Sequence, residues 1–524
     1  MIMDRFLVAG RRVALTGICA LVSACMPAQG TEQEAAVVEA GSRQPNIIVI
    51  LADDLGFNDI SLNGNPLVRT PNIDRLATSG IRFSHAYSAN AVCAPSRAAL
   101  LTGRHQQAFG FEFNPIIPPY IESLPATQAD VTETGPEHTG TSKDQYPPMS
   151  EIGIPDSELT IAQRLKAAGY STAHIGKWHL GSAPGKRPAD KGFDRVYGFL
   201  AGAALFAPAD RDGIVNAHLE DPFDAMVWAN VTNAISDDGE IIHPDRHLTD
   251  AFADEAVEFI SENREDPFLL YLAFNAPHNP LQARQDYYDR LSFIKDHKTR
   301  VYYAMVEQLD DAIGRVLDAV DEAGLSEDTL IIFASDNGGA SYTGIPVHNL
   351  PYRGWKATFF EGGIVVPMHA YWPGHIQPGQ LVTDPVSLLD IAPTILEAAG
   401  LPIPETFDGQ SLIGADAVSS DPSVSRPFFW RAEHYRVVRD GKYKLQISEF
   451  PEKTWLFDLE KDPGEHVNIA DAHPDIVSRL KDELSSWEAT LAEPIWPAME
   501  RRREFLDGYQ DPEVPDQEYI YYPL

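Results

Sequence analysis

The cysteine at position 93 is the first candidate for chemistry in this chain. It opens the run Cys-Ala-Pro-Ser-Arg at residues 93–97, which leads on to Gly103. Pro95 suits the first turn of a helix, Arg97 lies one turn after Cys93, and Gly103 is a favourable helix C-cap. The pattern predicts a helix whose N-terminal amides and dipole lie at Cys93 and favour an anion or a developing negative charge. A small, buried structural cysteine is the alternative.

Two apolar, strand-like runs end in side chains that carry oxygen. They are residues 46–51, which lead into Asp53 and Asp54, and residues 329–334, which lead into Asp336 and Asn337. Ligands of open α/β sheets bind at the carboxyl ends of the strands, so these four side chains fall where a site would be built. Either pair alone would also suit a helix cap or a turn. Together their oxygens suit a hard cation, Ca²⁺ more readily than Mg²⁺, and they suit zinc less well.

Three further segments supply cations and imidazoles. They are the strand-like residues 170–181 with Lys177 and His179, the residues after strand-like 268–274 with His278, and the loop 353–363 with Lys356. On one strand, Lys177 and His179 would project to the same face and could contact one ligand atom. Taken singly, these residues also fit a solvated strand edge, a structural histidine and an exposed loop lysine.

The string Cys-x-Pro-Ser-Arg followed by Leu-Thr-Gly-Arg resembles the signature of the type I sulfatases of the alkaline phosphatase superfamily. The order of the other elements, from Asp53 to Lys356, matches the same family. The resemblance implies that a formylglycine-generating enzyme or an equivalent maturase oxidises Cys93 to formylglycine. It also implies that Ca²⁺ is held by the formylglycine oxygen at position 93 together with four side chains, which are Asp53, Asp54, Asp336 and Asn337.

The same resemblance implies a role for each remaining residue. One hydroxyl of the hydrated formylglycine would attack sulfur, and deprotonation of the other would expel sulfate and restore the aldehyde. Arg97 would hold the diol, while Lys177 and Lys356 would neutralise the sulfuryl oxygens. His278, assisted by Lys356, would protonate the leaving alcohol, and His179 would deprotonate the second hydroxyl. Exchanging the two histidines would contradict nothing in the sequence.

Length and composition predict a globular chain with more than one hydrophobic core. It has 524 residues, of which 44% are hydrophobic and 10% aromatic. Alternating strand-like and helix-like segments predict an α/β fold with a large, mainly parallel or mixed sheet between helices, and a smaller α+β subdomain with an antiparallel sheet. The predicted parts are a catalytic domain at 46–412, a C-terminal subdomain at 413–493 with a hairpin around 440–441 and a helix at 476–491, and a tail at 494–524. The tail has no counterpart in the sulfatase pattern, and would either wrap the domain or support oligomerisation.

The N-terminus predicts export. Three arginines precede an apolar run at residues 13–24 that is too short to span a bilayer, so residues 1–24 fit a signal peptide. Residues 22–25, Val-Ser-Ala-Cys, resemble a bacterial lipobox that would lipidate Cys25; an ordinary signal peptidase site is the alternative. Residues 25–45 predict a flexible tether. The expected location is the periplasm or the outer membrane, with membrane contact only through the lipid anchor, and Cys93 is then the one thiol left to do chemistry.

The formal net charge is −35. Such a charge argues against a nucleic-acid partner, and it repels an anionic substrate at long range unless salt screens the field. Positive charge must therefore act locally, inside the pocket. The irregular segments at 113–158 and 201–244 are long enough to shape specificity, and the sequence does not name the alcohol that carried the sulfate.

Three functions stay open at this point. The first is hydrolysis of sulfate monoesters of a carbohydrate or an aryl alcohol. The second is a phosphonate monoester or phosphodiester hydrolase of the same superfamily, which can use the same modified residue; the oxygen-only ligand set argues against a dinuclear zinc phosphatase. The third is a noncatalytic binding protein with this fold, against which the intact set of catalytic residue types argues.

Overall fold

The computed structural model describes residues 43–115, 137–138, 146–413, 426–508 and 517–524. The predicted signal peptide, Cys25 and nearly all of the predicted tether lie outside these ranges, as does much of the segment at 113–158. Within the described ranges, no helix is both long and apolar enough to cross a bilayer.

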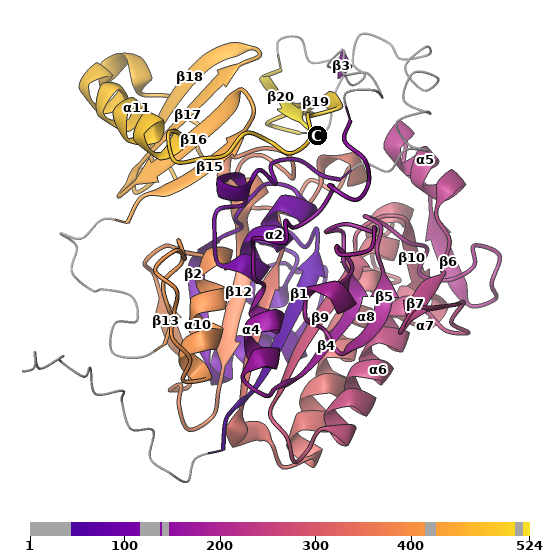
Figure 1. Ribbon diagram of the computed structural model, residues 1–524. Helices are drawn as coiled ribbons and strands as arrows, with labels where there is room; N and C mark the ends of the chain where they lie inside the picture. Colours follow the sequence, from indigo (N-terminus) through magenta and orange to yellow (C-terminus); the bar gives the residue numbers. More distant parts are fainter. Residues whose placement is uncertain (1–42, 116–136, 139–145, 414–425, 509–516) are drawn as a thin grey trace, which may run out of the picture. The chain divides into compact units, whose positions relative to one another are not determined.

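A mixed sheet of eleven strands lies at the centre of the described chain (Figure 1). Its strands are β1 (Asn46–Asp53), β2 (Ile81–Tyr87), β4 (Ser171–Lys177), β5 (Arg195–Phe199), β7 (Ile235–Asp237), β8 (Glu240–Ile242), β9 (Phe268–Pro277), β11 (Thr329–Ser335), β12 (Val365–Tyr371), β13 (Gln380–Val382) and β14 (Val386–Ser387). The order is β13-β2-β12-β11-β1-β9-β4-β5-β7-β8, and β14 pairs with β2. The strands from β11 to β5 are all parallel, which confirms the predicted α/β class with a mainly parallel sheet.

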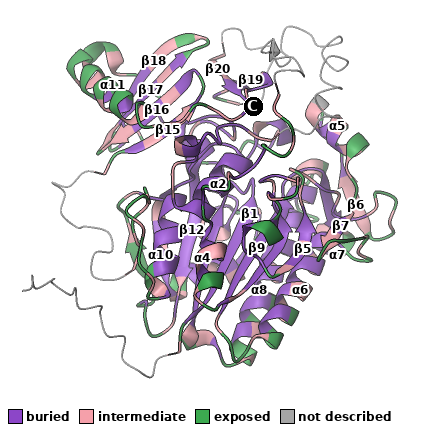
Figure 2. Cartoon of the chain, viewed as in Figure 1, coloured by how far each residue is buried: buried purple, intermediate pink, exposed green. Residues whose placement is uncertain are grey.

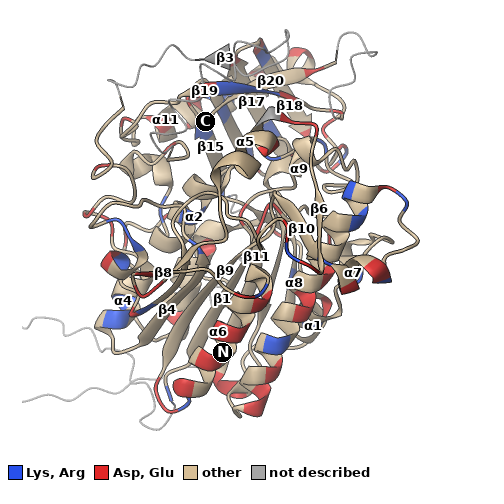
Figure 3. Cartoon of the chain, turned by 90° about the vertical axis from the view of Figure 1, so that its right-hand side faces the viewer, with Lys and Arg blue, Asp and Glu red and all other residues tan. Residues whose placement is uncertain are grey.

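Helices cover both faces of this sheet. One core contains residues of α1 (Pro71–Ser79), α6 (Leu248–Glu262) and α8 (His297–Glu322), and the other contains residues of α2 (Cys93–Thr102), α4 (Ile161–Ala167) and α10 (Ile391–Ala398). Successive residues of β1 alternate between the two cores, because side chains on a strand alternate between its faces. Both faces are therefore buried, as Figure 2 shows in purple for the central strands. Acidic residues mark the outer side of α6 (Figure 3).

Smaller elements lie around this sheet. They are the paired strands β6 (Ile214–Ala217) and β10 (Leu281–Arg284) and the short helices α5 (Pro222–Asn230), α7 (Gln285–Arg290) and α9 (Glu361–Ile364).

The C-terminal part carries the predicted antiparallel sheet. Its strands are β15 (Phe428–Ala432), β16 (Tyr435–Asp440), β17 (Tyr443–Glu449) and β18 (Glu452–Asp458), paired in that order. The hairpin predicted around Asp440 joins β16 to β17, and the predicted helix is α11 (Pro474–Glu488), which packs on the sheet through Leu480 and Leu484. Both elements are confirmed. Residues 43–524 form one compact unit, and the division near residue 413 stays a prediction.

The tail folds into a strand pair that the sequence did not predict. The strand β19 (Glu500–Phe505) pairs with β20 (Tyr519–Pro523) and with the two-residue strand β3 (Glu137–His138). Tyr522 is fully buried, and its hydroxyl donates to Asn90 Oδ1 at 2.6 Å. The tail therefore packs against the segment that precedes Cys93.

One glycine of β4 lies where the sheet leaves no room for a side chain. Gly176 has a φ of +110°, and a Cβ at this position would lie 1.9 Å from the carbonyl oxygen of Ala273 on β9. We expect Gly176→Ala to lower the free energy of unfolding by about 2 kcal/mol or more, because a left-handed backbone and an overlap in a packed core both destabilise. Urea unfolding followed by tryptophan fluorescence measures the change.

Gly169→Ala is the matched control for this prediction. Gly169 has a φ of +92°, but a Cβ there would have nothing within 4 Å, so the variant isolates the backbone contribution. An equal loss of stability in the two variants would show that the overlap with Ala273 does not matter.

Candidate active site

Cys93 is the first residue of α2, at the helix position that the sequence predicted. Val92 before it has extended backbone, and Gly103 at the other end is left-handed with a φ of 68° and donates its N–H to Ala99 O. Every residue of the helix is buried, and Cys93 itself is 1% exposed. The helix N-terminus therefore lies inside the protein, where its dipole is only weakly screened by water.

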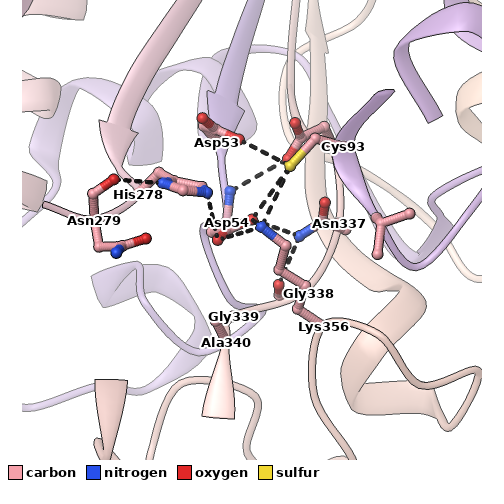
Figure 4. A network of polar contacts seen from close by, with 12 residues as sticks. Asp53, Asp54, Cys93, His278, Asn279, Asn337, Gly338, Gly339, Ala340 and Lys356 are labelled. Atoms are coloured by element: carbon pink, nitrogen blue, oxygen red, sulfur yellow. Dashed lines mark hydrogen bonds and ion pairs between the residues drawn. The ribbon is translucent and has the colours of Figure 1, made fainter. Parts of the chain in front are cut away.

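The Cys93 thiol is surrounded by charged groups. Its Sγ lies 3.3 Å from Asp53 Oδ1 and 3.7 Å from Asp54 Oδ1, and Lys356 Nζ lies 3.3 Å away (Figure 4). Burial raises the pKa of the Cys93 thiol well above its ordinary value, although Lys177 and Lys356 act in the opposite direction. A thiolate nucleophile is therefore disfavoured at this position.

The two oxygen-bearing pairs meet because β1 and β11 are neighbouring parallel strands. Asp53 is the last residue of β1, and Asp336 is the first residue after β11. The backbone N–H of Asp54 donates to Asp336 Oδ1 at 3.2 Å, and Asn337 Nδ2 donates to Asp54 Oδ1 at 2.8 Å. All four side chains are buried at the carboxyl edge of the sheet.

Three cations face these three carboxylates. The closest distances are 2.7 Å for Lys177 to Asp53, 2.8 Å for Lys356 to Asp54 and 2.7 Å for Arg97 to Asp336. Arg97 is completely enclosed, and it also donates to the backbone carbonyl of Lys177 at 3.0 Å. Because a buried ion without a partner is strongly destabilising, each member of the cluster depends on its counterpart.

The pKa values follow from the positions of these groups. Burial raises the pKa of Asp336 to about 6, although Arg97 opposes this. Burial also acts to raise the pKa of Asp54, but Lys356, His278 and Lys177 outweigh it and hold that pKa below its usual range. Burial would lower the pKa of Lys356, yet Asp54 and Cys93 raise it well above normal, so Lys356 stays a cation.

His278 lies one residue beyond β9 and faces Asp54. Its Nδ1 donates to the carbonyl oxygen of Asn279 at 2.6 Å, and its Nε2 lies 3.6 Å from Asp54 Oδ2. Burial lowers the pKa of His278 to about 3, and Lys356 and Lys177 add to this against the effect of Asp54. A pKa of about 3 favours the neutral imidazole near pH 7.

His179 reaches the same site by a different path from the one the sequence predicted. The strand β4 ends at Lys177, and His179 has a left-handed φ of 60°, so the prediction that both residues project from one strand face is wrong. The backbone N–H groups of Trp178 and His179 donate to the carbonyls of Phe199 and Leu200, which holds the chain against the end of β5. Burial lowers the pKa of His179 well below normal, and Lys177 and Arg97 lower it further.

Sequence reasoning missed two residues that support the site. Tyr342, in the 3-10 turn Ser341–Thr343, donates its hydroxyl to Asp54 Oδ2 at 2.9 Å. Asn114 accepts the backbone N–H of Ala94 through its Oδ1 at 3.2 Å. Both lie in loops without periodicity, and for Tyr342 the only available signal was its place six residues after Asp336.

The residues present fit a bound divalent cation. Asp53, Asp54, Cys93 and His278 offer ligand atoms that all lie within 4.8 Å of one another. Asn337 adds an amide oxygen that is buried and has no hydrogen-bond partner among the described residues. Carboxylate and amide oxygens suit a hard cation such as Ca²⁺. Of the predicted ligands, Asp336 lies at the same edge of the sheet but pairs with Arg97.

Comparison with known proteins finds similarity to sulfatases over most of the chain. The Sulfatase family model matches residues 45–401, and the model for the C-terminal region of N-sulphoglucosamine sulphohydrolase matches residues 353–490. N-acetylgalactosamine-6-sulfatase of Mus musculus is 32% identical, over 87% of this chain and 88% of the relative. Steryl-sulfatase of Homo sapiens is also 32% identical, over 91% and 90%.

Among solved structures, Ps i-CgsB in complex with k-i-k-neocarrahexaose superposes with a TM-score of 0.72. It is 30% identical, over 87% of this chain and 95% of that one. The fold and the site thus define a sulfatase-type hydrolase of the alkaline phosphatase superfamily. The chain belongs to the sulfatase family.

The enclosed ion pair of Arg97 generates a stability prediction. We expect Arg97→Met to lower the free energy of unfolding by about 3–5 kcal/mol, because it leaves the carboxylate of Asp336 buried without its cation. Urea unfolding in the presence of a chelator measures this without a contribution from bound metal.

Arg75→Met is the control for a lost arginine ion pair. Arg75 lies 2.6 Å from Asp321, but the two side chains are 36% and 43% exposed, and such a pair contributes less than about 1 kcal/mol. Similar effects of the two substitutions would refute the importance of the buried pair.

Proposed function

We propose that this chain hydrolyses sulfate monoesters with formylglycine at position 93 and Ca²⁺ held beside it. The observation that carries the proposal is the position of Cys93, buried at the N-terminus of α2 and in contact with Asp53, Asp54 and Lys356. A hydrated aldehyde at this position supplies two hydroxyls on one carbon, one to attack sulfur and one to be deprotonated afterwards. The raised pKa of the Cys93 thiol supports a modified residue over a working thiolate.

Ca²⁺ would be held by the oxygen at position 93 together with Asp53, Asp54, Asp336 and Asn337, and it would supply positive charge beside the sulfuryl oxygens. The described cluster has three carboxylates and three cations, so its own charges nearly balance. A divalent cation makes the site positive. This explains how an anionic ester binds to a protein whose net charge is −35.

Two lysines and an arginine of the chain act on the substrate and the nucleophile. Lys177 and Lys356 stabilise charge on the sulfuryl oxygens, and Lys356 is protonated and 3.3 Å from the atom at position 93. Arg97 fixes the orientation of α2 against Asp336.

The proton for the leaving alcohol comes from His278 with the help of Lys356. A neutral His278 gains that proton when an anionic ester binds next to it and raises its pKa.

His179 accepts the second proton, from the remaining hydroxyl of the hydrated formylglycine. Its Nδ1 has no hydrogen-bond partner among the described residues, and cations around it keep the imidazole neutral and able to accept a proton. The ring is held in place by the loop at Gly202, where even a Cβ would lie 2.8 Å from it.

We propose a sulfated saccharide or an aryl sulfate as the substrate class. The names of two relatives support it, N-acetylgalactosamine-6-sulfatase and arylsulfatase of Hemicentrotus pulcherrimus. We also propose that a maturase converts Cys93, and that the chain is exported and anchored through Cys25 at the periplasmic side of a bacterial membrane. The support for this is the sequence of residues 1–25.

Parallel assays test the proposed reaction. We expect enzyme from a host with a formylglycine-generating enzyme to hydrolyse 4-nitrophenyl sulfate faster than a 4-nitrophenyl phosphonate ester, because the family model and the relatives that match the chain are those of sulfatases. Cys93→Ala should abolish turnover and keep the wild-type circular dichroism spectrum and melting temperature. Mass spectrometry of the peptide that contains residue 93 should show formylglycine in the active enzyme.

Two results would contradict this proposal. Faster turnover of the phosphonate would favour a phosphonate monoester hydrolase of the same superfamily. Active enzyme with only unmodified thiol at residue 93 would rule out the formylglycine nucleophile.

Removal of Ca²⁺ tests the metal assignment separately. We expect a chelator to lower both the sulfatase rate and the melting temperature, and added Ca²⁺ to restore both, since a ligand that binds only the folded state stabilises it by about 2.7 kcal/mol at a hundred times its Kd. Asn337→Leu removes the unpartnered amide oxygen and should weaken the Ca²⁺-dependent rise in melting temperature. If chelator and Ca²⁺ leave the melting temperature unchanged, the cluster holds no metal.

A further inference from the structure

A cavity of about 470 Å³ lies over Cys93. Its inner end carries His179, His278 and Lys356. Beyond this end the walls are largely apolar, with Val92, Met149, Ile152, Leu200, Met226 and Val227 among the lining residues. The alcohol part of a substrate would lie between these walls, because its sulfate must reach position 93.

We call the wall formed by the C-terminal strand β19 the outer wall. It contributes Glu500, Arg502 and Glu504 to the lining, all from the predicted tail at 494–524. Arg502 is not available to a second anion of a substrate. Its Nη2 lies 3.1 Å from Asp221 Oδ2, and its Nε lies 2.8 Å from Glu504 Oε1.

Arg502 and Glu504 of this wall are held by contacts with neighbouring side chains. The guanidinium of Arg502 lies 5.0 Å from the ring centre of Tyr342 and 5.9 Å from that of Phe223. Glu504 is 4% exposed and accepts the hydroxyl of Ser341 at 2.7 Å. The ion pair with Arg502 and the hydrogen bond from Ser341 orient the carboxylate of Glu504.

The charges of the outer wall are opposite to those of the inner end. Among the described lining residues outside the catalytic end, Arg502 is the one cation, and the lining also carries the carboxylates of Glu500 and Glu504. A third carboxylate, Asp221, pairs with Arg502 but is not part of the lining. A second sulfate or a carboxylate on the substrate would face apolar walls that cannot solvate it and carboxylates that repel it.

We propose that this cavity selects sulfate esters whose alcohol part carries no second anionic group, and that Glu504 is a residue that determines this selectivity. The inference rests on the proposed sulfate ester hydrolysis and narrows its substrate class. Uncharged sugars and aryl or alicyclic alcohols fit the cavity, since each offers an apolar face to the side walls. Disulfated sugars and sulfated uronates do not.

A matched pair of esters tests the inference on the full, formylglycine-containing protein. The pair is 4-nitrophenyl sulfate and the same ester with one carboxylate on its ring. We expect kcat/KM to be at least about tenfold lower for the carboxylated ester, with most of the change in KM, because the added charge is repelled before chemistry begins. Glu504→Gln should reduce this ratio several-fold, and Glu500→Gln serves as a second variant if the first does not fold.

Glu518→Gln is the control. Glu518 belongs to the same tail and pairs with Arg353 and Lys453, but it does not line the cavity, so the substitution removes an equal charge elsewhere. Its kcat/KM ratio should equal that of the wild type.

The outcomes separate the two proposals. Equal or faster turnover of the carboxylated ester by the wild type would overturn the inference and leave the sulfatase function standing. An unchanged ratio in a folded Glu504→Gln variant would overturn the assignment to Glu504. Failure to hydrolyse either ester, with formylglycine confirmed at position 93, would overturn the proposed function and this inference with it.

Discussion

The structure depends on the pairing of three buried carboxylates with three buried cations at the carboxyl edge of the central sheet. Each pair joins segments far apart in the sequence, for example Arg97 of α2 with Asp336 after β11. Removing one partner would leave a charge with neither water nor a counter-ion. The same ions that would bind and activate a sulfate ester therefore also hold the loops of the site together, and a substitution in one of them affects stability and activity at once.

These ion pairs also stabilise nearby backbone conformations with positive φ, which are unfavourable for residues other than glycine. Two of the residues other than glycine with positive φ in the described chain line the cavity, His179 at 60° and Ala357 at 64°. A third, Asp54 at 63°, lies beside Cys93. Such conformations cost about 1–3 kcal/mol each and persist where the surroundings determine them. Behind Asp54, the buried carboxylate of Asp59 accepts hydrogen bonds from Tyr302 and His348, which anchors the loop that carries the strained residue.

Much of this arrangement could be predicted because it follows from strand order and local patterns. The sequence predicted the α/β class, the start of α2 at Cys93 and the hairpin after Asp440, since each depends on short-range signals. It assigned His179 to the site but wrongly to the same strand face as Lys177, because a left-handed residue after β4 leaves no trace in an alternating pattern. It also missed Tyr342 and the strand pair of the tail, whose positions depend on long-range packing.

The tail shows why a family match does not define a substrate. The ions at Cys93 recognise a sulfate group, which every substrate of such a site shares, so they carry no information about the alcohol. That information lies in the outer wall, where Arg502 is neutralised by Asp221 and Glu504. If Arg502 had no carboxylate partners, the same position would attract a second anion. The substrate charge that this cavity accepts is therefore decided by the acidic neighbours of one arginine, and the arginine alone would predict the opposite preference.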